Sequence, residues 1–420
     1  SILLGVEARL AKTDAVLLCM SVAAMGAMAR IYLANRRTPD TPVGWRLPAI
    51  LWTALAAGVL IKGPLILMFV GLTALTLSIA DRSARWIWSL RPFAGLAWLL
   101  VLVLPWFIAI VAKSGASFFA QSVGQDMLAK VTSGQEAHGA PPGYYFLLFW
   151  VTFWPGAVLT GLAAPRVWQA RREPGARFLL AWLLPSWAVF EAVITKLPHY
   201  VLPLYPAIAI MIAGSLEPGG LMTNRWLMRG TAWWFVFPAI VSIVVAVGFV
   251  VIGHDLGIIA WPFAAAATIY GLFAWWLYEV DGPERAVLRG MVSSIFIAIT
   301  VYAVTFPSLP ALFPNAVIAD DLRESGCDKP QVASTGYYEE PSLVFLLGTD
   351  TRFTDGAGAA EFLAKGPCHF ALIDARSERG FAQRADAIGL RYALSQRVEG
   401  YNISVGRPVT LTIFRSAAKP

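Results

Sequence analysis

The sequence predicts a polytopic α-helical membrane protein with a small α/β domain at its carboxyl end. Of its 420 residues, 57% are hydrophobic and only 14% are charged, whereas a soluble domain has about 25% charged residues. All 17 tryptophans lie in residues 1–315, which hold 21 basic and 13 acidic residues, against 12 and 13 in residues 316–420. The net charge of +7 therefore belongs to the apolar part, and it does not indicate nucleic-acid binding.

Apolar runs long enough to be membrane spans follow one another through the first 315 residues. A helix needs about 20 residues at 1.5 Å each to cross a hydrocarbon core of roughly 30 Å. About ten spans are therefore expected, at residues 14–34, 47–61, 63–80, 93–112, 143–164, 178–195, 199–215, 230–252, 257–279 and 290–308.

One pair of these runs has to be a hairpin. From Leu47 to Ala80 the chain has a single charged residue, Lys62. As one helix this stretch would be about 51 Å long, which the bilayer cannot hold. We therefore expect a bend at Lys62-Gly63-Pro64, and by the same argument a bend at Thr195-Lys196-Leu197-Pro198-His199.

Basic residues assign each loop to one side of the membrane. Fifteen arginines fall in one set of loops and six basic residues in the other, so the first set is expected in the cytoplasm and both chain ends outside. The cytoplasmic set is Arg30, Arg36, Arg37, Arg46, Arg82, Arg85, Arg91, Arg166, Arg171, Arg172, Arg177, Arg225, Arg229, Arg285 and Arg289. The outer set is Arg9, Lys12, Lys62, Lys113, Lys130 and Lys196.

Residues 316–420 are expected to form a soluble α/β domain on the outer face, after a transmembrane domain at residues 1–315. Runs of β-branched and aromatic residues predict strands, and helical periodicity predicts helices. The strands are expected at 330–335, 370–374 and 409–414, and the helices at 316–325, 358–365 and 377–389. Cys327 and Cys368 either form a disulfide, if this domain is outside the cytoplasm, or stay free buried thiols.

Charged residues gather at the outer ends of the expected spans. Glu7-Ala8-Arg9-Leu10-Ala11-Lys12-Thr13-Asp14 places four charges directly before the first span. Asp14 is either part of a site or an ordinary helix cap within a solvated collar. The hairpin arms around Lys62 are short for full crossings, so its ammonium is expected below the surface, where a phosphate would be a suitable partner. The alternative is that Lys62 extends to the lipid headgroups.

The segment from Lys196 to Pro206 combines a cation, an imidazole, two phenols and three prolines at a membrane boundary. Prolines break a helix, and non-helical backbone at this depth is tolerated where it lines a cavity or is covered by protein. Lys196 with His199 therefore indicates a site for an anionic headgroup, although Lys196 paired with Glu191 would be a purely structural arrangement.

Residues 113–142 form the longest outer connection, and loops longer than about 15 residues are often lids or binding loops. His138 and Glu136 in this loop could contact a metal, but two residues do not make a site, and a solvated loop histidine is the better explanation of His138 by itself. The residues thus leave two function classes: a transferase using a lipid phosphate donor, or a transporter or flippase of such a lipid. The transferase is favoured because the charges cluster at one rim and no internal repeat is found.

Four motifs together resemble one family. They are Glu7-Ala8-Arg9 with Asp14, Leu60-Ile61-Lys62-Gly63-Pro64, His138-Gly139 ahead of Tyr144-Tyr145, and Lys196-Leu197-Pro198-His199-Tyr200-Val201-Leu202-Pro203-Leu204-Tyr205-Pro206. In order and spacing they resemble the bacterial GT-C membrane glycosyltransferases related to lipid A aminoarabinose transferase and to protein O-mannosyltransferases. The motifs cover residues 1 to about 215, and the rest matches in layout.

The resemblance implies inverting transfer of a sugar from a polyprenyl phosphate donor to lipid A, another glycolipid or a protein hydroxyl, at the periplasmic face of the bacterial inner membrane. It implies that Asp14 is a catalytic carboxylate, that His138 lies in the mobile loop over the cavity, and that a divalent metal is compatible with the site. The donor phosphate and sugar would be bound by Arg9, Lys62, Lys196, His199 and Tyr200.

One departure from the family concerns the amino-terminal end. The family's main catalytic carboxylate lies in the first outer loop, and this chain begins after that point. We therefore expect an amino-terminally truncated transferase that is inactive alone but still binds the donor.

Overall fold

The computed structural model describes residues 1–10, 12–38, 44–115, 139–216, 221, 224–335, 340–402 and 406–416. The chain divides into two compact units. The first consists of Ser1–Pro238 with Thr268–Ser294, and the second of Ala239–Ala267 with Ile295–Pro420. The second unit thus joins two apolar segments to the carboxyl-terminal sheet, and the expected boundary at residue 315 stays a prediction.

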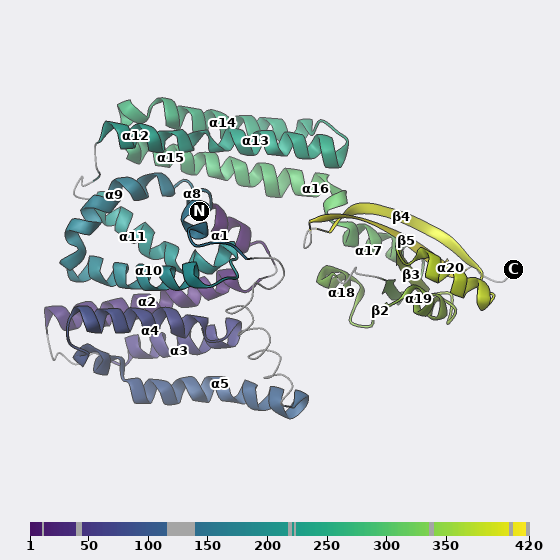
Figure 1. Ribbon diagram of the computed structural model, residues 1–420, viewed down its shortest axis with the longest axis horizontal. Helices are drawn as coiled ribbons and strands as arrows, with labels where there is room; N and C mark the ends of the chain where they lie inside the picture. Colours follow the sequence, from purple (N-terminus) through teal and green to yellow (C-terminus); the bar gives the residue numbers. More distant parts are fainter. Residues whose placement is uncertain are drawn as a thin grey trace. The chain divides into compact units, whose positions relative to one another are not determined.

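The first unit is built of helices (Figure 1). Its amino-terminal helices are α1 (Ile2–Glu7), α2 (Asp14–Arg37), α3 (Arg46–Lys62), α4 (Leu65–Ala80), η1 (Arg85–Leu90) and α5 (Pro92–Ser114). They are followed by α8 (Tyr144–Thr152), α9 (Ala157–Gln169), η4 (Ala170–Arg172), α10 (Pro174–Ala192), η5 (Pro198–Leu204), α11 (Tyr205–Leu216), α12 (Arg225–Ala232) and η6 (Trp233–Val236). Helix α2 packs against α3, and α4 packs against α10.

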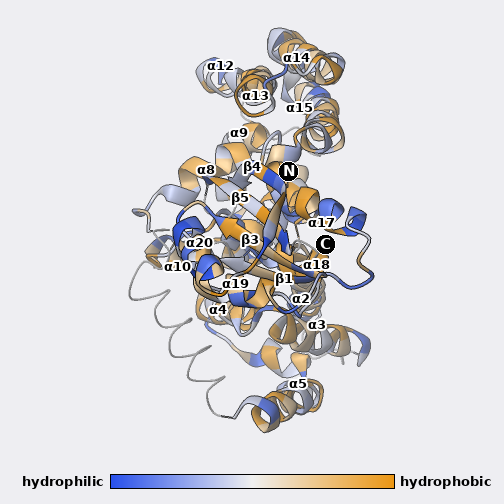
Figure 2. Cartoon of the chain, turned by 90° about the vertical axis from the view of Figure 1, so that its right-hand side faces the viewer, coloured by the Kyte–Doolittle hydropathy of each residue, from blue (hydrophilic) through white to orange (hydrophobic). Residues whose placement is uncertain are grey.

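The remaining helices span residues 237–312, which belong partly to the first unit and partly to the second. They are α13 (Phe237–Gly248), η7 (Phe249–Gly253), η8 (Ile258–Ala260), α14 (Trp261–Trp276), α15 (Tyr278–Ala298), η9 (Ile299–Thr305), α16 (Phe306–Ser308) and η10 (Pro310–Leu312). In Figure 2 α13 and α14 are largely hydrophobic, whereas α20 of the carboxyl-terminal region is largely hydrophilic. This contrast agrees with a membrane part and a water-exposed part.

The hairpin predicted at Lys62 is confirmed. Helix α3 ends at Lys62, and α4 begins at Leu65. Gly63 makes the turn with φ of +70°, a conformation that glycine adopts without the steric cost of a Cβ atom. The bend at residues 195–199 is also present, because α10 ends at Ala192 and η5 begins at Pro198.

The expected number of spans is not confirmed. Among the described residues, six helices are long and apolar enough to cross a membrane, or seven if the bent pair α8 and α9 counts as one span. The chain is helical in all ten expected ranges, but several segments are short or broken. The expected span 143–164 breaks at Trp154, Pro155 and Gly156, and its two halves meet at 118°. Proline lacks the backbone donor that would continue the helix.

The far ends of α2, α4 and α10 are joined by polar contacts. Asp81, just after α4, accepts a hydrogen bond from the Tyr32 hydroxyl of α2 (2.8 Å) and forms an ion pair with Arg177 of α10. The Asp81 side chain is 3% exposed, so both contacts are largely shielded from water. These contacts fix three helices whose opposite ends contribute to the candidate site or border it.

The carboxyl-terminal sheet has the order β2-β1-β3-β5-β4. Its strands are β1 (Gln331–Thr335), β2 (Arg352–Thr354), β3 (His369–Asp374), β4 (Tyr392–Asn402) and β5 (Arg407–Ser416). Strand β1 is parallel to β2 and β3, and β5 is antiparallel to β3 and β4. The helices are α17 (Pro314–Glu324), α18 (Pro341–Leu347), α19 (Gly356–Leu363) and α20 (Glu378–Ala387).

The three predicted strands and three predicted helices of this region are present. Strands β2 and β4 and helix α18 were not predicted, because β2 has only three residues and β4 contains charged residues that weaken the strand pattern. The two sides of the sheet are covered by separate apolar cores, one around Ile318 and Phe370 and one around Ala371 and Phe381.

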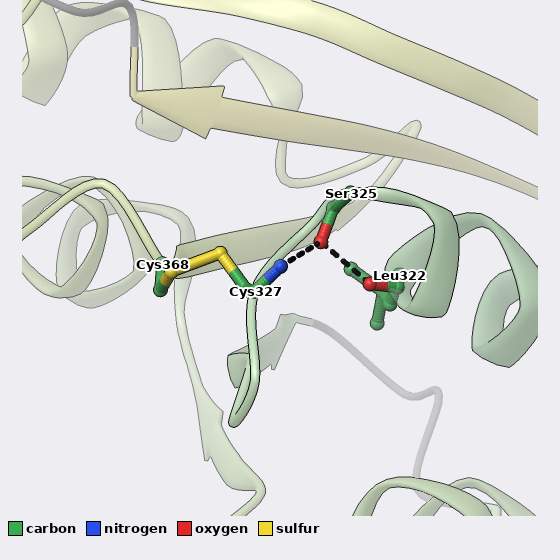
Figure 3. The surroundings of a disulfide bond; sticks show 4 residues. All are labelled: Leu322, Ser325, Cys327 and Cys368. Atoms are coloured by element: carbon green, nitrogen blue, oxygen red, sulfur yellow. Dashed lines mark hydrogen bonds between the residues drawn. A yellow bond between two sulfur atoms is a disulfide. The ribbon is translucent and has the colours of Figure 1, made fainter.

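Cys327 and Cys368 form a disulfide, so the first of the two alternatives holds (Figure 3). The bond links the segment after α17 to the residue before β3, with a Cα–Cα distance of 5.8 Å. The Cys327 N–H donates to Ser325 Oγ (3.4 Å), and the Ser325 hydroxyl donates to the Leu322 carbonyl (2.5 Å). The bond thereby ties the end of α17 to the centre of the sheet.

Candidate functional site

Four helix ends of the first unit bring ionisable side chains to one place. Glu7 is the last residue of α1, Asp14 the first of α2, and Lys62 the last of α3. His199 lies in η5, where Pro198 and Pro203 impose a tight helical turn. Asp14 and Lys62 are 48 positions apart in the sequence, and His199 lies far beyond both, so these residues meet because the hairpin and the proline-rich turn end side by side.

Three of the four polar members are buried, and the Lys62 side chain is 24% exposed. Glu7 is 4% exposed, Asp14 5% and His199 7%. Lys62 donates to and forms an ion pair with Asp14 Oδ1. His199 stands between the carboxylates, with Nδ1 3.6 Å from Glu7 Oε1 and Nε2 3.8 Å from Asp14 Oδ2. One imidazole therefore bridges two carboxyl groups at distances slightly longer than hydrogen bonds.

Glu7 is the carboxyl group of this cluster that can still accept a further hydrogen bond. Burial raises its pKa, the Asp14 charge acts in the same direction, and the ammonium groups of Lys12 and Lys62 oppose the rise. Among the described residues, Glu7 Oε2 is buried without a hydrogen-bond partner. A buried carboxyl oxygen in this state is suited to bind a proton, a cation or a substrate hydroxyl.

Tyr200 completes the predicted phosphate-binding side of the cluster. The Lys62 ammonium lies 5.9 Å from the centre of the Tyr200 ring, and the rings of His199 and Tyr200 are 5.1 Å apart and nearly perpendicular. The structure therefore brings Asp14, Lys62, His199 and Tyr200 together, and their role in binding a phosphate stays a prediction.

Lys196 lies beside this cluster but contacts backbone. Its ammonium donates to the carbonyls of Phe190 (3.2 Å), Glu191 (2.8 Å) and Val193 (2.7 Å), and the residue is 4% exposed. These are carbonyls at the end of α10, where a cation also complements the helix dipole. Phosphate binding by Lys196 stays a prediction, and it requires this ammonium to leave its three acceptors.

The Glu191 carboxylate does not pair with Lys196. It accepts hydrogen bonds from the Gly143 N–H (2.8 Å) and the Phe146 N–H (3.3 Å), which satisfies donors at the start of α8. Gly139 forms an antiparallel bridge with Thr195. The chain that enters α8 is therefore held at two places, by Glu191 of α10 and by Thr195 in the turn before η5.

Arg9 and His138 are the remaining predicted site residues. Arg9 is exposed, and its guanidinium donates to the Gly5 carbonyl (2.8 Å). His138 lies outside the described residues. Conversely, the sequence reasoning did not single out Glu7 as a site residue, although it lies in the quoted Glu7-Ala8-Arg9 motif. The signal that could have identified it is an acidic residue at the end of an otherwise apolar helical run.

Glu7, Asp14 and His199 are also a set that could hold a metal ion. One ligand atom of each lies within 4.8 Å of the other two. Two carboxylates and an imidazole fit a divalent cation by donor type, and the unpartnered Glu7 Oε2 offers a further ligand atom. Lys62 already neutralises part of this negative charge, so a divalent cation would compete with its ammonium.

An apolar groove of about 390 Å³ begins next to this region. Its wall includes Phe146, whose N–H donates to Glu191, and Trp187, one turn before Glu191. The groove is lined by residues of α8, α9, α10 and α11: Phe146, Phe149, Thr160, Ala163, Ala164, Val167, Trp168, Leu180, Leu183, Leu184, Trp187, Ile208, Met211 and Ile212. Nearly all of these side chains are hydrocarbon or aromatic, which suits an acyl or prenyl chain.

Comparison with known proteins gives one consistent group of relatives. No family model matches the chain. It is 30% identical over 234 residues to undecaprenyl phosphate-alpha-4-amino-4-deoxy-L-arabinose arabinosyl transferase of Enterobacter sp. (strain 638), covering 53% of this chain and 39% of that protein. The transferase of the same name from Pseudomonas aeruginosa (strain LESB58) is 29% identical over 188 residues, covering 45% and 33%. The chain thus matches less than half the length of these curated relatives.

Two solved structures share the fold over nearly the whole chain. The crystal structure of ArnT from Cupriavidus metallidurans bound to undecaprenyl phosphate covers 98% of this chain and 77% of that protein, with a TM-score of 0.66 and 18% identity. The apo structure of the same protein gives a TM-score of 0.64 and 16% identity. The chain therefore has an ArnT-like fold, and its sequence is similar to aminoarabinose transferases.

Proposed function

We propose that the chain is a membrane glycosyltransferase that moves a sugar from a polyprenyl phosphate donor to an outer-face acceptor, with inversion at the anomeric carbon. The observation that carries the proposal is the buried cluster of Glu7, Asp14, Lys62 and His199. Glycosyl transfer from a phosphate needs a carboxylate that takes the acceptor proton and cations that stabilise the departing phosphate. This cluster contains both kinds of group.

In this proposal the cationic and phenolic groups bind the phosphate. Lys62 supplies the principal charge, with His199 and Tyr200 beside it and Arg9 at the exposed rim. Lys196 joins them on leaving its carbonyl partners. The acceptor hydroxyl oxygen bonds to the anomeric carbon as the bond between this carbon and the phosphate oxygen breaks. Lys62 and its neighbours stabilise the negative charge left on the phosphate.

The carboxylates take the proton and hold the cations. Asp14 acts as a catalytic carboxylate that also positions Lys62 and His199. Glu7 is the second candidate proton acceptor because its Oε2 has no partner among the described residues. A divalent cation bound by Glu7, Asp14 and His199 would supply further positive charge for the leaving phosphate.

The proposed lipid tail lies in the groove between α8, α9, α10 and α11. The volume of the groove, about 390 Å³, and its hydrophobic lining support this placement. Because the lining residue Phe146 contacts Glu191, a lipid seated at this end of the groove would have its phosphate close to η5. The proposed location is the bacterial inner membrane, with the disulfide-bonded domain in the oxidising periplasm. Lipid A is the proposed acceptor, because the family that the sequence motifs resemble includes lipid A aminoarabinose transferase. The names of the similar curated proteins support aminoarabinose as the sugar.

Native mass spectrometry of the detergent-purified chain tests the donor site. Polyprenyl phosphate and the matching polyprenol, which lacks the phosphate, are titrated against wild type, Lys62→Ala and His199→Ala. We expect wild type to bind polyprenyl phosphate more tightly than polyprenol. Each variant should bind polyprenyl phosphate about tenfold more weakly than wild type does, which corresponds to a loss of about 1.4 kcal/mol in binding free energy.

Lys113→Ala is the matched control, because Lys113 lies in the last turn of α5 and is exposed. Equal binding of polyprenyl phosphate by all four proteins would contradict the proposed phosphate site. Phosphate-dependent binding together with movement of the lipid between leaflets, and no sugar transfer, would favour a flippase instead.

A further inference from the structure

A second cavity, distinct from the proposed donor groove, lies in the first unit. Its volume is about 380 Å³. It is formed by the end of α12 with η6, the end of α14 and the start of α15. The lining residues are Arg229, Ala232, Trp233, Trp275, Trp276, Tyr278, Glu279 and Val280.

The cavity lies where candidate membrane spans end. The spans Arg225–Gly253 and Tyr278–Ser308 begin here, and Ile258–Trp276 ends here. Tryptophan and tyrosine concentrate at the level of the lipid headgroups. Four arginines of the set expected in the cytoplasm are close by in the sequence, which assigns this end to the inner leaflet: Arg225, Arg229, Arg285 and Arg289.

Two lining residues carry opposite charges, and both remain accessible. Arg229 Nε lies 2.5 Å from Glu279 Oε1, and their side chains are 46% and 49% exposed. An ion pair with this exposure contributes little to stability, so a ligand can replace either partner. The neighbouring Asp281 differs: its side chain is 19% exposed and it is held by Arg289.

Aromatic side chains form the rest of the wall. The rings of Trp233 and Trp275 are 5.1 Å apart with an interplanar angle of 40°, and Trp276 is 70% exposed. Tyr278 is fixed by a hydrogen bond between its hydroxyl and that of Thr231 (3.1 Å). Indole faces attract an ammonium group, more strongly when water is partly excluded.

We propose that this cavity binds the headgroup of an aminophospholipid of the inner leaflet. The lipid phosphate binds Arg229, and the primary ammonium binds Glu279 and lies against the indole faces. The charge pattern supports this occupant, because one cation and one anion stand side by side as the phosphate and ammonium of the headgroup do. Exposed Leu272 and Ile269 on α14 provide an apolar path for the acyl chains.

The charge of Glu279 makes the proposal specific. A phosphatidylglycerol headgroup has no cation, so it would leave Glu279 unpaired once Arg229 turns to the phosphate. Phosphatidylcholine keeps the positive charge but has no N–H to donate to the carboxylate. The preferred ligand is therefore phosphatidylethanolamine, followed by phosphatidylcholine and then phosphatidylglycerol.

The delipidated 420-residue chain is titrated with each of these three lipids and analysed by native mass spectrometry. We expect wild type to bind phosphatidylethanolamine about tenfold more tightly than phosphatidylglycerol. Glu279→Gln should reduce this preference to about twofold or less, and Glu279→Asp should preserve most of it. Trp276→Leu should weaken both amine-containing lipids and leave phosphatidylglycerol unchanged.

Arg285→Gln is the matched control. Arg285 is an exposed arginine of α15, the helix that carries Glu279, and it does not line the cavity. It should keep the wild-type preference. Thermal unfolding of every variant in detergent verifies that it is folded. Equal binding of the three lipids by wild type, or an unchanged preference in folded Glu279→Gln, would overturn the proposal.

Discussion

At the residue scale, the main feature is a charge cluster buried at the ends of several helices. Taking a carboxylate and an ammonium out of water is costly unless they pair closely, and Asp14 and Lys62 do so. The sequence predicted that Lys62 would be recessed, because its hairpin arms are short. It could not predict that Glu7 shares the site, because this depends on the path of the chain between α1 and α2.

The Asp14–Lys62 pair should be strongly coupled. We expect Asp14→Asn to lower the free energy of unfolding by about 2 kcal/mol, because it leaves the Lys62 ammonium partly buried without its partner. In combination with Lys62→Met, the loss should be smaller than the sum of the two single losses. Thermal unfolding of the four proteins in detergent measures this coupling, and additive effects would show that the pair is not coupled.

Glu7 should give the protein a measurable pH dependence. Its pKa in the folded state is raised, so between the ordinary value of 4.5 and the folded value the folded protein binds more protons than the unfolded chain. The contribution of Glu7 to stability therefore falls as pH rises through this window. Glu7→Gln should raise the melting temperature at pH 7 but leave it nearly unchanged at pH 4, in buffer containing EDTA. A lower melting temperature at pH 7 would contradict this prediction.

At the element scale, the end of α10 organises the surroundings of the site. Its last turn binds the Lys196 ammonium, and the Glu191 carboxylate binds the start of α8. The sequence indicated that Lys196 and Glu191 are near each other. Their side chains do not form an ion pair, because the Lys196 ammonium binds backbone carbonyls and the Glu191 carboxylate binds the N–H groups of α8. Side-chain direction at a broken helix end depends on backbone angles that hydrophobic periodicity does not specify.

Lys196→Ala separates a structural role from phosphate binding. A structural role alone predicts about 1–3 kcal/mol less stability, because three buried carbonyls lose their donor. Polyprenyl phosphate binding, measured well below the melting temperature, would then stay within about twofold of wild type. A tenfold loss of binding would instead support direct contact with the phosphate.

At the scale of the whole molecule, composition predicted the fold class well and the number of spans poorly. Apolar content separates membrane helices from the sheet domain, but it cannot tell a full crossing from a helix pair bent at Pro155 and Gly156. The parallel strands β1 and β3 were predicted because they contain β-branched or aromatic residues. Strand β4 escaped prediction because it lies at the edge, where charged residues are accepted.

The disulfide should stabilise the second unit. It closes a loop with a sequence separation of 41 residues, for which loop-closure entropy gives about 4 kcal/mol. We expect the double variant Cys327→Ser with Cys368→Ser to unfold its sheet region at a lower temperature, measured by calorimetry. Cys19→Ser, which changes a free cysteine, should leave this transition unchanged.

The two edges of the sheet differ in construction but have the same consequence. Strand β2 offers only three residues for pairing, and β4 has an irregular register between Leu394 and Gln396 and an exposed Arg397–Glu399 ion pair. Each feature makes it unfavourable for an additional strand to join by backbone hydrogen bonds. Outer domains crowded together in the plane of a membrane should therefore resist joining edge to edge, which protects a densely expressed protein from cross-strand aggregation.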